Sequence, residues 1–418
     1  MKLSAQLVSD CREQFPALER MHGKHPAIYL DGPAGTQVPR AVMDAICDYL
    51  SRCNANHGGL FATSQESDRL LDEVHQAVAD FLGVSDPGEV CFGANMTSLT
   101  FALSRALAQT WQTGDEIVVT RLEHDANFSP WVLAARDAGV EVRYVQINPT
   151  DCTLDLADFR EKINDKTRLV AVGCASNASG TVNPVGTICG WAREVGALSF
   201  LDAVHFAPHQ RINIPAWGCD FLACSAYKFF GPHVGILWGR RDLLEEHQPY
   251  KLRPAPDDLP GRWMTGTQNH ECLAGTMAAI DYLADLGKKI QGDADMTRSD
   301  ALDAAFHEIR QYETGLCRLL LEGLLAIPGI TVHGITDSGR MTERFPTVSF
   351  THEKHTAQQL ARGLGEAGIF VWDGNYYALP LTEAIGVEPE GMVRVGLVHY
   401  NTEEEVNRFL DSLRNLVD

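Results

Sequence analysis

The stretch Ser225-Ala226-Tyr227-Lys228-Phe229-Phe230-Gly231-Pro232 places a single lysine between aromatic residues, just before a Gly-Pro pair. The runs 218–224 and 235–239 on either side are apolar, and both are typical of buried strands. Lys228 is therefore expected on a turn beside a sheet. Burial there favours the neutral amine, which is the form that condenses with an aldehyde. The alternative is a loop lysine that reaches solvent past an aromatic neighbour.

From about residue 27 to 240, short apolar runs alternate with amphipathic segments. This pattern predicts an α/β fold, with a mostly parallel sheet covered by helices on both faces. The expected strands are 89–92, 116–120, 142–147, 168–173, 198–202, 221–225 and 235–239. The expected helices are 39–53, 64–82, 97–110 and 187–195.

The second half of the chain indicates a further, smaller domain. A polar, proline-rich stretch at 253–261 is typical of a surface loop, and a long helical region follows it. From about residue 330 strands and helices alternate again, and the last helix is predicted to start at a capping box, Thr402-Glu403-Glu404-Glu405. We expect an N-terminal segment at 1–25 that packs with the small domain, a large cofactor-binding domain at 26–290 and a small C-terminal domain at 291–418.

The composition excludes several classes of protein. Of 418 residues 45% are hydrophobic and 22% charged, as in ordinary globular proteins. A net charge of -20 argues against nucleic acid or an anionic membrane as a partner, because both bind basic surfaces. The start of the chain lacks the apolar core of a signal peptide, and no apolar run could span a membrane, so a cytoplasmic location is expected. The 11 cysteines form no C-x-x-C pair, which predicts neither a metal site nor a disulfide framework.

A second candidate residue, Asp202, ends the apolar run 198–202. In open α/β sheets ligands bind at the carboxyl ends of the strands. A carboxylate there can pair with a protonated pyridine nitrogen and so keep the ring an electron sink. The alternative is a side chain that caps the following turn. Asp202 and Lys228 together make the strongest argument for a catalytic site.

With these residues the chain resembles the cysteine desulfurase-like branch of the class V aminotransferases, which are pyridoxal 5'-phosphate (PLP) enzymes of fold type I. The resemblance covers nearly the whole chain. Most of its motifs are weak signals individually, but their occurrence in this order is specific. They are Tyr29-Leu30-Asp31-Gly32-Pro33-Ala34-Gly35, Glu123-His124-Asp125-Ala126-Asn127, Asn177-Ala178-Ser179-Gly180, Asp202-Ala203-Val204-His205, Ser225-Ala226-Tyr227-Lys228, Gly266-Thr267-Gln268-Asn269, Arg394-Val395-Gly396 and Tyr400-Asn401-Thr402-Glu403-Glu404-Glu405.

The resemblance implies PLP as the cofactor and assigns roles around its ring. Lys228 would carry the cofactor and Asp202 would face its ring nitrogen. His124 would stack on the ring, an aromatic contact that fixes the ring plane. Asn177 would bind the phenolic oxygen and help to hold the substrate. His205 would lie near the same oxygen, where the family usually has glutamine, so a group that can titrate replaces one that cannot.

The resemblance also implies a phosphate site. The segment Gly93-Ala94-Asn95-Met96-Thr97-Ser98 precedes an apolar helix, and helix N-termini bind anions. Met96 and Thr97 stand where the family commonly has two threonines. Ser225 would add a hydroxyl, and Tyr227 replaces the family's usual histidine. Gly266-Thr267 resembles a segment that reaches the phosphate from the neighbouring subunit, which implies a homodimer with composite active sites.

Arg394 lies inside the apolar run Met392-Val393-Arg394-Val395-Gly396. A buried charge is costly unless it is paired, and a guanidinium group matches a carboxylate with two hydrogen bonds. An internal salt bridge is one explanation. The resemblance favours the α-carboxylate of an amino-acid substrate.

The chain departs from the family where sulfur-transferring members carry a cysteine on a loop. Here the stretch is Asp373-Gly374-Asn375-Tyr376-Tyr377-Ala378-Leu379-Pro380, with Tyr377 at the cysteine position, and no cysteine follows Cys317. The chain therefore lacks the thiolate that would accept sulfur as a persulfide. The residues do not choose among elimination, epimerisation and transamination, and it is the resemblance to the desulfurase branch that favours a C–S lyase acting by β-elimination. Tyr377 is either a general acid or base, or a wall of the pocket. A class V aminotransferase or an amino-acid epimerase is the alternative, and a non-catalytic PLP-binding amino-acid sensor is the alternative from another class.

Overall fold

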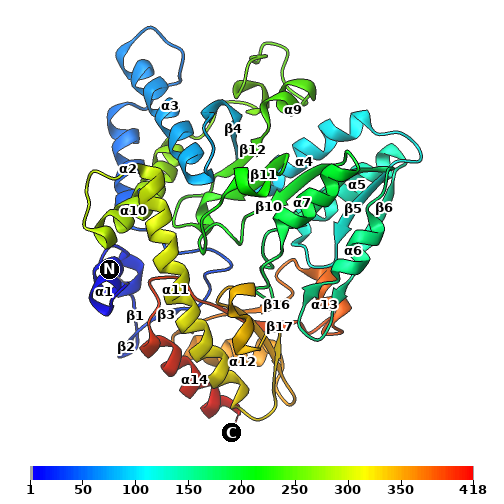
Figure 1. Ribbon diagram of the computed structural model, residues 1–418. Coiled ribbons are helices and arrows are strands. Elements are labelled where there is room, and N and C mark those ends of the chain that lie inside the picture. The colour runs from blue at the N-terminus through cyan, green and yellow to red at the C-terminus, as the bar shows by residue number, and fades with distance from the viewer. Residues whose placement is uncertain (1–2, 418) are drawn as a thin grey trace.

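The computed structural model describes residues 3–417 and is built around a seven-stranded sheet (Figure 1). The strands lie in the order β4-β12-β11-β10-β9-β5-β6. Neighbouring strands are parallel except at β12, which is antiparallel to both β11 and β4. The bounds are β4 Val90–Gly93, β5 Glu116–Thr120, β6 Glu141–Val145, β9 Thr167–Gly173, β10 Leu198–Asp202, β11 Phe221–Ser225 and β12 Gly235–Gly239. The predicted α/β fold with a mixed, mostly parallel sheet is confirmed.

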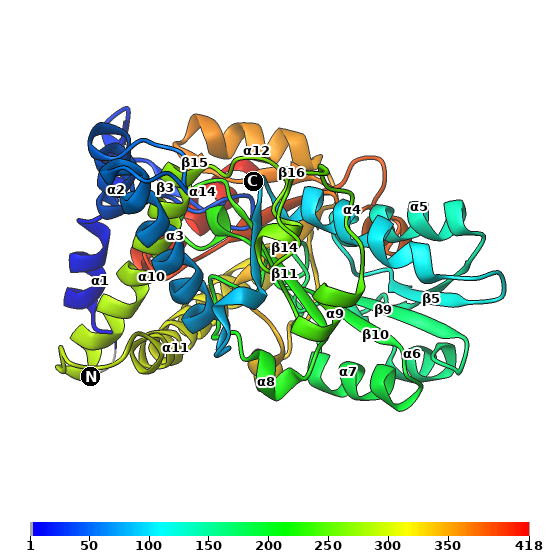
Figure 2. The same cartoon turned by 90° about the horizontal axis from the view of Figure 1, so that it is seen from above.

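Helices cover both faces of this sheet (Figure 2). Alternate residues of β9 explain why: Leu169 and Ala171 belong to the core shared with α4 and α5, whereas Val170 and Val172 belong to the core shared with α6 and α7. Both faces of the strand are therefore buried, as expected of a parallel sheet. The helices are α4 Met96–Leu107, α5 Ser129–Ala138, α6 Leu156–Lys162, α7 Val185–Glu194, α8 Ile214–Trp217 and α9 Arg241–Glu246.

A group of long helices lies beside the sheet and leads into the C-terminal part of the chain (Figure 1). Helix α10 packs against α2, α3 and α11. The N-terminal helix is tied to the end of the chain by Arg12, which forms an ion pair with Glu405 at 2.8 Å. The bounds are α1 Ala5–Arg12, α2 Arg40–Arg52, α3 Ala62–Leu82, α10 His270–Gln291 and α11 Arg298–Leu325.

The C-terminal part contains an antiparallel four-stranded sheet in the order β13-β14-β17-β16. Its buried face forms a separate core with α11, α12 and α14. The bounds are β13 Ile330–His333, β14 Thr347–His352, β16 Trp372–Gly374, β17 Met392–Gly396, α12 Ala357–Glu366, α13 Leu379–Ala384 and α14 Glu403–Val417. The remaining short strands are β1 Met21–His22, β2 His25–Pro26, β3 Ile28–Tyr29, β7 Ile147–Asn148, β8 Thr153–Leu154 and β15 Ile369–Phe370.

Two local predictions show how side chains set the ends of elements. The capping box before α14 is confirmed, because the Thr402 hydroxyl accepts the Glu405 N–H and the Glu405 carboxylate accepts the Thr402 N–H, both at 3.2 Å. The strand expected over 142–147 is wrong at its end. Strand β6 stops at Val145, because the Gln146 N–H donates to the Asp158 carboxylate at 2.7 Å and the next residues pair with β8 instead. Within residues 3–417 no helix is long and apolar enough to cross a membrane.

Candidate active site

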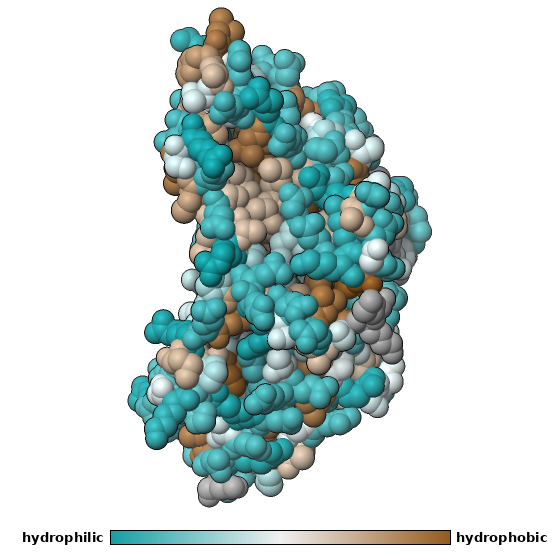
Figure 3. Space-filling view, turned by 90° about the vertical axis from the view of Figure 1, so that its left-hand side faces the viewer, coloured by the Kyte–Doolittle hydropathy of each residue, from teal (hydrophilic) through white to brown (hydrophobic). Residues whose placement is uncertain are grey.

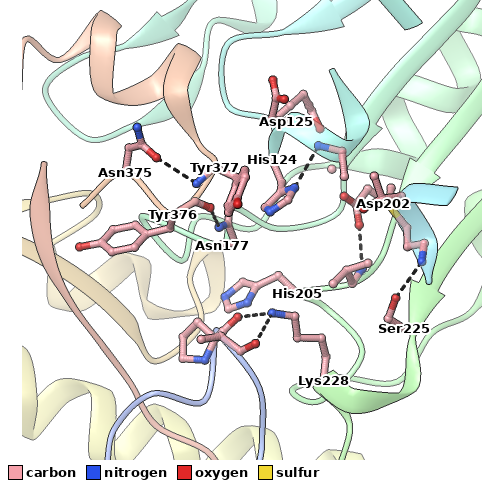
Figure 4. Close-up of a pocket in the computed structure, with 18 of the residues that line it drawn as sticks. His124, Asp125, Asn177, Asp202, His205, Ser225, Lys228, Asn375, Tyr376 and Tyr377 are labelled. Carbon is pink, nitrogen blue, oxygen red and sulfur yellow. Dashed lines mark hydrogen bonds between the residues drawn. The ribbon is translucent and has the colours of Figure 1, made fainter. Parts of the chain in front are cut away.

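A cavity of about 810 Å³ opens where β5, β9, β10 and β11 end, between the large sheet and the segment 372–377 (Figure 4). Of the predicted site residues, all except Gly266 and Thr267 line it. Those that do are Met96, Thr97, His124, Asn177, Asp202, His205, Ser225, Tyr227, Lys228, Tyr377 and Arg394. Residues far apart in the sequence thus meet at the carboxyl ends of the strands, where open α/β sheets bind ligands.

Lys228 lies in a single 3₁₀ turn, Ala226–Lys228, directly after β11. Its Nζ donates to the backbone oxygens of Pro33 at 2.5 Å and Ala34 at 2.9 Å, and it lies 4.7 Å from the centre of the Tyr227 ring. Burial and then the nearby Arg394 charge lower the pKa of Lys228 to about 7. At neutral pH a large fraction of this amine is therefore neutral and able to act as a nucleophile.

Asp202 is the last residue of β10 and is 7% exposed. One carboxylate oxygen accepts the Val204 N–H at 2.8 Å, so Asp202 does brace the following turn. The carboxylate also lines the cavity. Burial raises its pKa to about 6, opposed by the Val204 hydrogen bond and by Lys228. A positive charge placed opposite would keep this carboxylate ionised.

His124 follows β5 and is held at a defined angle. Its Nδ1 accepts the Ala126 N–H at 3.0 Å, which leaves Nε2 as the protonated nitrogen of the neutral ring. Burial lowers the pKa of His124 to about 4, helped by the charges of Lys228 and Arg394. Its ring stacks on that of Tyr377, with centroids 5.6 Å apart and planes 29° from parallel. A neutral, oriented imidazole suits an aromatic partner.

Two buried polar atoms in the cavity have no hydrogen-bond partner among residues 3–417: Asn177 Oδ1 and His205 Nε2. The other end of the Asn177 amide donates to the backbone oxygen of Tyr376 at 2.9 Å (Figure 4). Burial lowers the pKa of His205 well below its usual value, so the ring is neutral. Buried polar atoms are rarely left unpaired, so both positions favour a polar ligand.

The N-terminus of α4 borders the cavity, where Asn95, Met96 and Thr97 line it beside Ser225. The Met96 N–H donates to the Ser225 hydroxyl at 3.1 Å, and the Asn95 side chain accepts the Ser98 N–H at 2.9 Å. The exposed Thr97 adds a hydroxyl and an amide at the first turn. The positive end of a helix together with these groups fits a phosphate.

Arg394 lies in β17 and is 4% exposed. Its Nη1 donates to the Asn177 backbone oxygen at 3.0 Å, and its guanidinium lies 4.2 Å from the centre of the Tyr376 ring. The structure shows no ion pair for Arg394 within residues 3–417, so the internal salt bridge considered from the sequence is absent there. Burial lowers its pKa to about 10, which leaves it charged at neutral pH.

Sequence reasoning gave no role to two acids, Glu123 in the cavity wall and Asp31 beside it. Asp31 lies near Arg394 and Lys228, has a buried oxygen without a partner among residues 3–417, and has its pKa raised by burial to about 6. Glu123 precedes His124, is buried, and accepts hydrogen bonds from Thr120 and Asn127, both at 2.6 Å. Both acids lie within motifs that carry the family resemblance, and that position was the sequence signal that could have identified them.

The exposed Gly266 and Thr267 lie outside the cavity of their own chain. Among residues 3–417 no group of histidine, cysteine and acidic side chains could hold a metal ion.

Taken together, the groups fit a phosphorylated pyridine aldehyde. The half-buried lysine amine can bind the aldehyde and the strand-end carboxylate can face the ring nitrogen. The helix N-terminus suits the phosphate, and the unpaired atoms of Asn177 and His205 suit a ring oxygen. The fold and the site define an enzyme of the PLP-dependent α/β class.

Comparison with known proteins agrees. Residues 28–409 match the family described as aminotransferase class-V. A cysteine desulfurase of Yersinia pseudotuberculosis is 32% identical over 420 residues, which covers 97% of each chain. The apo structure of a cysteine desulfurase from Thermococcus onnurineus superposes with a TM-score of 0.87 at 27% identity over 98% of each chain. A cysteine desulfurase structure from Escherichia coli, with a TM-score of 0.83, 24% identity and 98% of each chain covered, shares the fold. The chain belongs to the aminotransferase class-V family of PLP-dependent enzymes.

Proposed function

We propose that this protein is a PLP-dependent C–S lyase that cleaves sulfur-containing amino acids by β-elimination and uses no persulfide cysteine. The claim that no persulfide cysteine is used is supported by the cavity lining, because no cysteine lines the cavity within residues 3–417. Eight of the 11 cysteines are buried, and the other three are Cys47, Cys53 and Cys272, none of which lies at the cavity. A thiol that accepts sulfur must be ionised and must reach the substrate.

The cofactor would be held by the groups described above. The α4 N-terminus, Thr97 and Ser225 would bind the phosphate, and Asn177 and His205 the phenolic oxygen. When bound, PLP supplies an aldehyde that accepts amines and a ring that stabilises a carbanion beside the substrate nitrogen.

Residues of the chain would each have a separate role in the reaction. Lys228 Nζ would bind the cofactor, yield it to the substrate amine, and take the α-proton. His124 would hold the ring plane, and Asp202 would keep the proton on the ring nitrogen. Tyr377 is 72% exposed with its ring stacked on His124, which favours a wall of the pocket over a general acid.

A homodimer is part of this proposal. Gly266 and Thr267 lie outside their own cavity, so they are free to reach a partner's phosphate site. The face that carries α2, α3 and α10 is mostly hydrophilic, with small hydrophobic patches scattered over it (Figure 3). Leu60, in the loop just before α3, is 96% exposed, and its neighbour Phe61 is 58% exposed. These two neighbouring apolar side chains would be available for a contact with a second subunit. A cytoplasmic location belongs to the same proposal.

The proposal is tested by incubating the purified protein with L- and D-amino acids, cystine and cysteine conjugates. β-Elimination consumes one water and should release pyruvate, ammonia and the thiol-containing fragment in equal amounts. Keto acid that retains the substrate side chain would instead indicate transamination, and inverted α-carbon stereochemistry would indicate epimerisation. A protein persulfide trapped during turnover would restore the desulfurase mechanism. A spectral response to amino acids without any product would indicate a sensor.

Arg394→Ala is expected to lower kcat/KM by an amount that corresponds to roughly 2–5 kcal/mol of lost transition-state stabilisation. The reason is that it removes a buried partner of the substrate carboxylate. Arg394→Lys should restore only part of the activity, since a point charge lacks the two-pronged geometry. The measurement compares each variant on an amino acid and on its carboxamide, which presents no charge. If wild type and Arg394→Ala discriminate equally between the two, Arg394 does not read the carboxylate.

A further inference from the structure

The segment 373–377 contains an unusual turn. Tyr376 and Tyr377 have φ values of 57° and 59°, so two consecutive residues other than glycine adopt the left-handed conformation. Side chains with a Cβ rarely adopt this conformation, because the Cβ approaches the following carbonyl oxygen. Strain of this kind persists where surrounding contacts impose it, and it concentrates at functional sites.

Hydrogen bonds impose this turn from both sides of the cavity. The Tyr376 oxygen accepts the Asn177 side-chain amide at 2.9 Å, and the Tyr377 oxygen accepts the Asp125 N–H at 2.7 Å. The Tyr377 N–H donates to the Asn375 side chain at 3.1 Å (Figure 4). Segments that follow β5 and β9 of the large sheet therefore hold the turn, which itself belongs to the C-terminal part of the chain.

The turn places the Tyr376 ring against Arg394. The guanidinium carbon lies 4.2 Å from the ring centre, within the range of a cation–π contact. The Tyr376 hydroxyl donates to the Met392 backbone oxygen in the same strand as Arg394, so the far end of the ring is fixed as well. On its other side Arg394 Nη1 donates to the Asn177 oxygen. The guanidinium is thus held by a ring face and one carbonyl, while Nε and Nη2 have no acceptor within residues 3–417.

We propose that Tyr376 is a positioning residue that orients Arg394 for the α-carboxylate of the substrate, which restricts the enzyme to amino acids with a free carboxylate. This inference rests on the proposed function, because it assumes that Arg394 reads the substrate. A ring on one face of a guanidinium leaves its hydrogen-bonding edge open, and that edge is the part that binds a carboxylate with two bonds. Asn177 contacts both the turn and Arg394. Its side-chain N–H donates to the Tyr376 backbone oxygen, and its backbone oxygen accepts from Arg394.

The test measures binding rather than turnover. Cofactor-free protein is titrated by calorimetry with N-phosphopyridoxyl-L-alanine and with the corresponding alaninamide, which has no carboxylate. Wild type should prefer the carboxylate form. Tyr376→Leu and Tyr376→Asn, which lack the ring, should lower that preference by about three- to thirtyfold. Tyr376→Phe, which keeps the ring and loses only the hydroxyl, should retain most of it.

The controls separate orientation from folding. Asparagine tolerates a left-handed backbone, so Tyr376→Asn should fold even if the leucine variant does not. Tyr250→Leu, at an exposed loop tyrosine, should change nothing. If the ring-less variants melt like wild type and keep its preference, Tyr376 only fills space and the inference is wrong. If Arg394→Ala also keeps the preference, the carboxylate site of the proposed function is wrong instead.

Discussion

Lys228→Ala is expected to abolish both turnover and the visible absorbance band of the bound cofactor. The reason is that Lys228 provides the lysine amine at this cavity, and within residues 3–417 no other lysine lines it. The variant would lose the covalent attachment of the cofactor and the base that takes the α-proton. We expect kcat to fall by roughly 10³-fold or more. Absorbance spectroscopy of the purified variant and a product assay measure the two effects.

Lys354→Ala is the matched control. Lys354 lies on the surface with its side chain 74% exposed, so its removal should alter neither the band nor turnover. Thermal unfolding of both variants separates loss of chemistry from loss of fold. Normal turnover by a folded Lys228→Ala variant would contradict the assignment of the whole site.

Lys228 should also make the binding of PLP to the cofactor-free protein depend on pH. Burial lowers the Lys228 pKa to about 7, so the neutral, nucleophilic form gains as pH rises through 7. The rate at which cofactor-free protein binds PLP should therefore rise by about tenfold from pH 6 to pH 8 and then level off. A lysine with its ordinary pKa would still be gaining neutral amine above pH 9. Stopped-flow absorbance, with a free lysine derivative as reference for the cofactor's own ionisation, distinguishes the two.

Much of the large sheet could be predicted from the sequence because its strands are apolar on both faces. Strands β5, β10, β11 and β12 have the bounds expected of them, and each is fully or almost fully buried. In a parallel sheet such runs end where ligands bind, so the polar residue that closes a run is itself a signal. Asp202 was identified in this way, and Lys228 by its aromatic neighbours and its position on the turn between two such runs.

The rest of the site depends on contacts that side-chain identity does not encode. The carbonyl oxygens of Pro33 and Ala34 hold Lys228, and every residue has a carbonyl oxygen. The left-handed turn at Tyr376 is imposed from outside by Asn177 and by the chain after β5, against the local preference of tyrosine. Sequence reasoning therefore identified Arg394 but not the ring that orients it.

Asp202→Asn is expected to bind the cofactor nearly as well as wild type but to exchange the substrate α-hydrogen more slowly. The asparagine oxygen can still accept the Val204 N–H, so the turn after β10 should survive. The negative charge opposite the ring nitrogen would be lost, and with it the group that keeps that nitrogen protonated. In a buried site a preorganised charge is worth far more than in water, and we expect roughly a 10²–10³-fold decrease. Exchange of the α-hydrogen in deuterated water, followed by NMR, measures it.

Asp220→Asn provides the comparison, because Asp220 also braces the large sheet through its carboxylate. It lies just before β11, at the opposite end of that strand from Lys228, and accepts the Ser199 N–H at 2.8 Å. Its ion pair with Arg240 means that the substitution should lower stability without touching the cavity. Exchange should therefore be slowed by Asp202→Asn and unchanged by Asp220→Asn. Equal exchange in both variants and wild type would mean that the Asp202 carboxylate serves only to brace the turn at Val204.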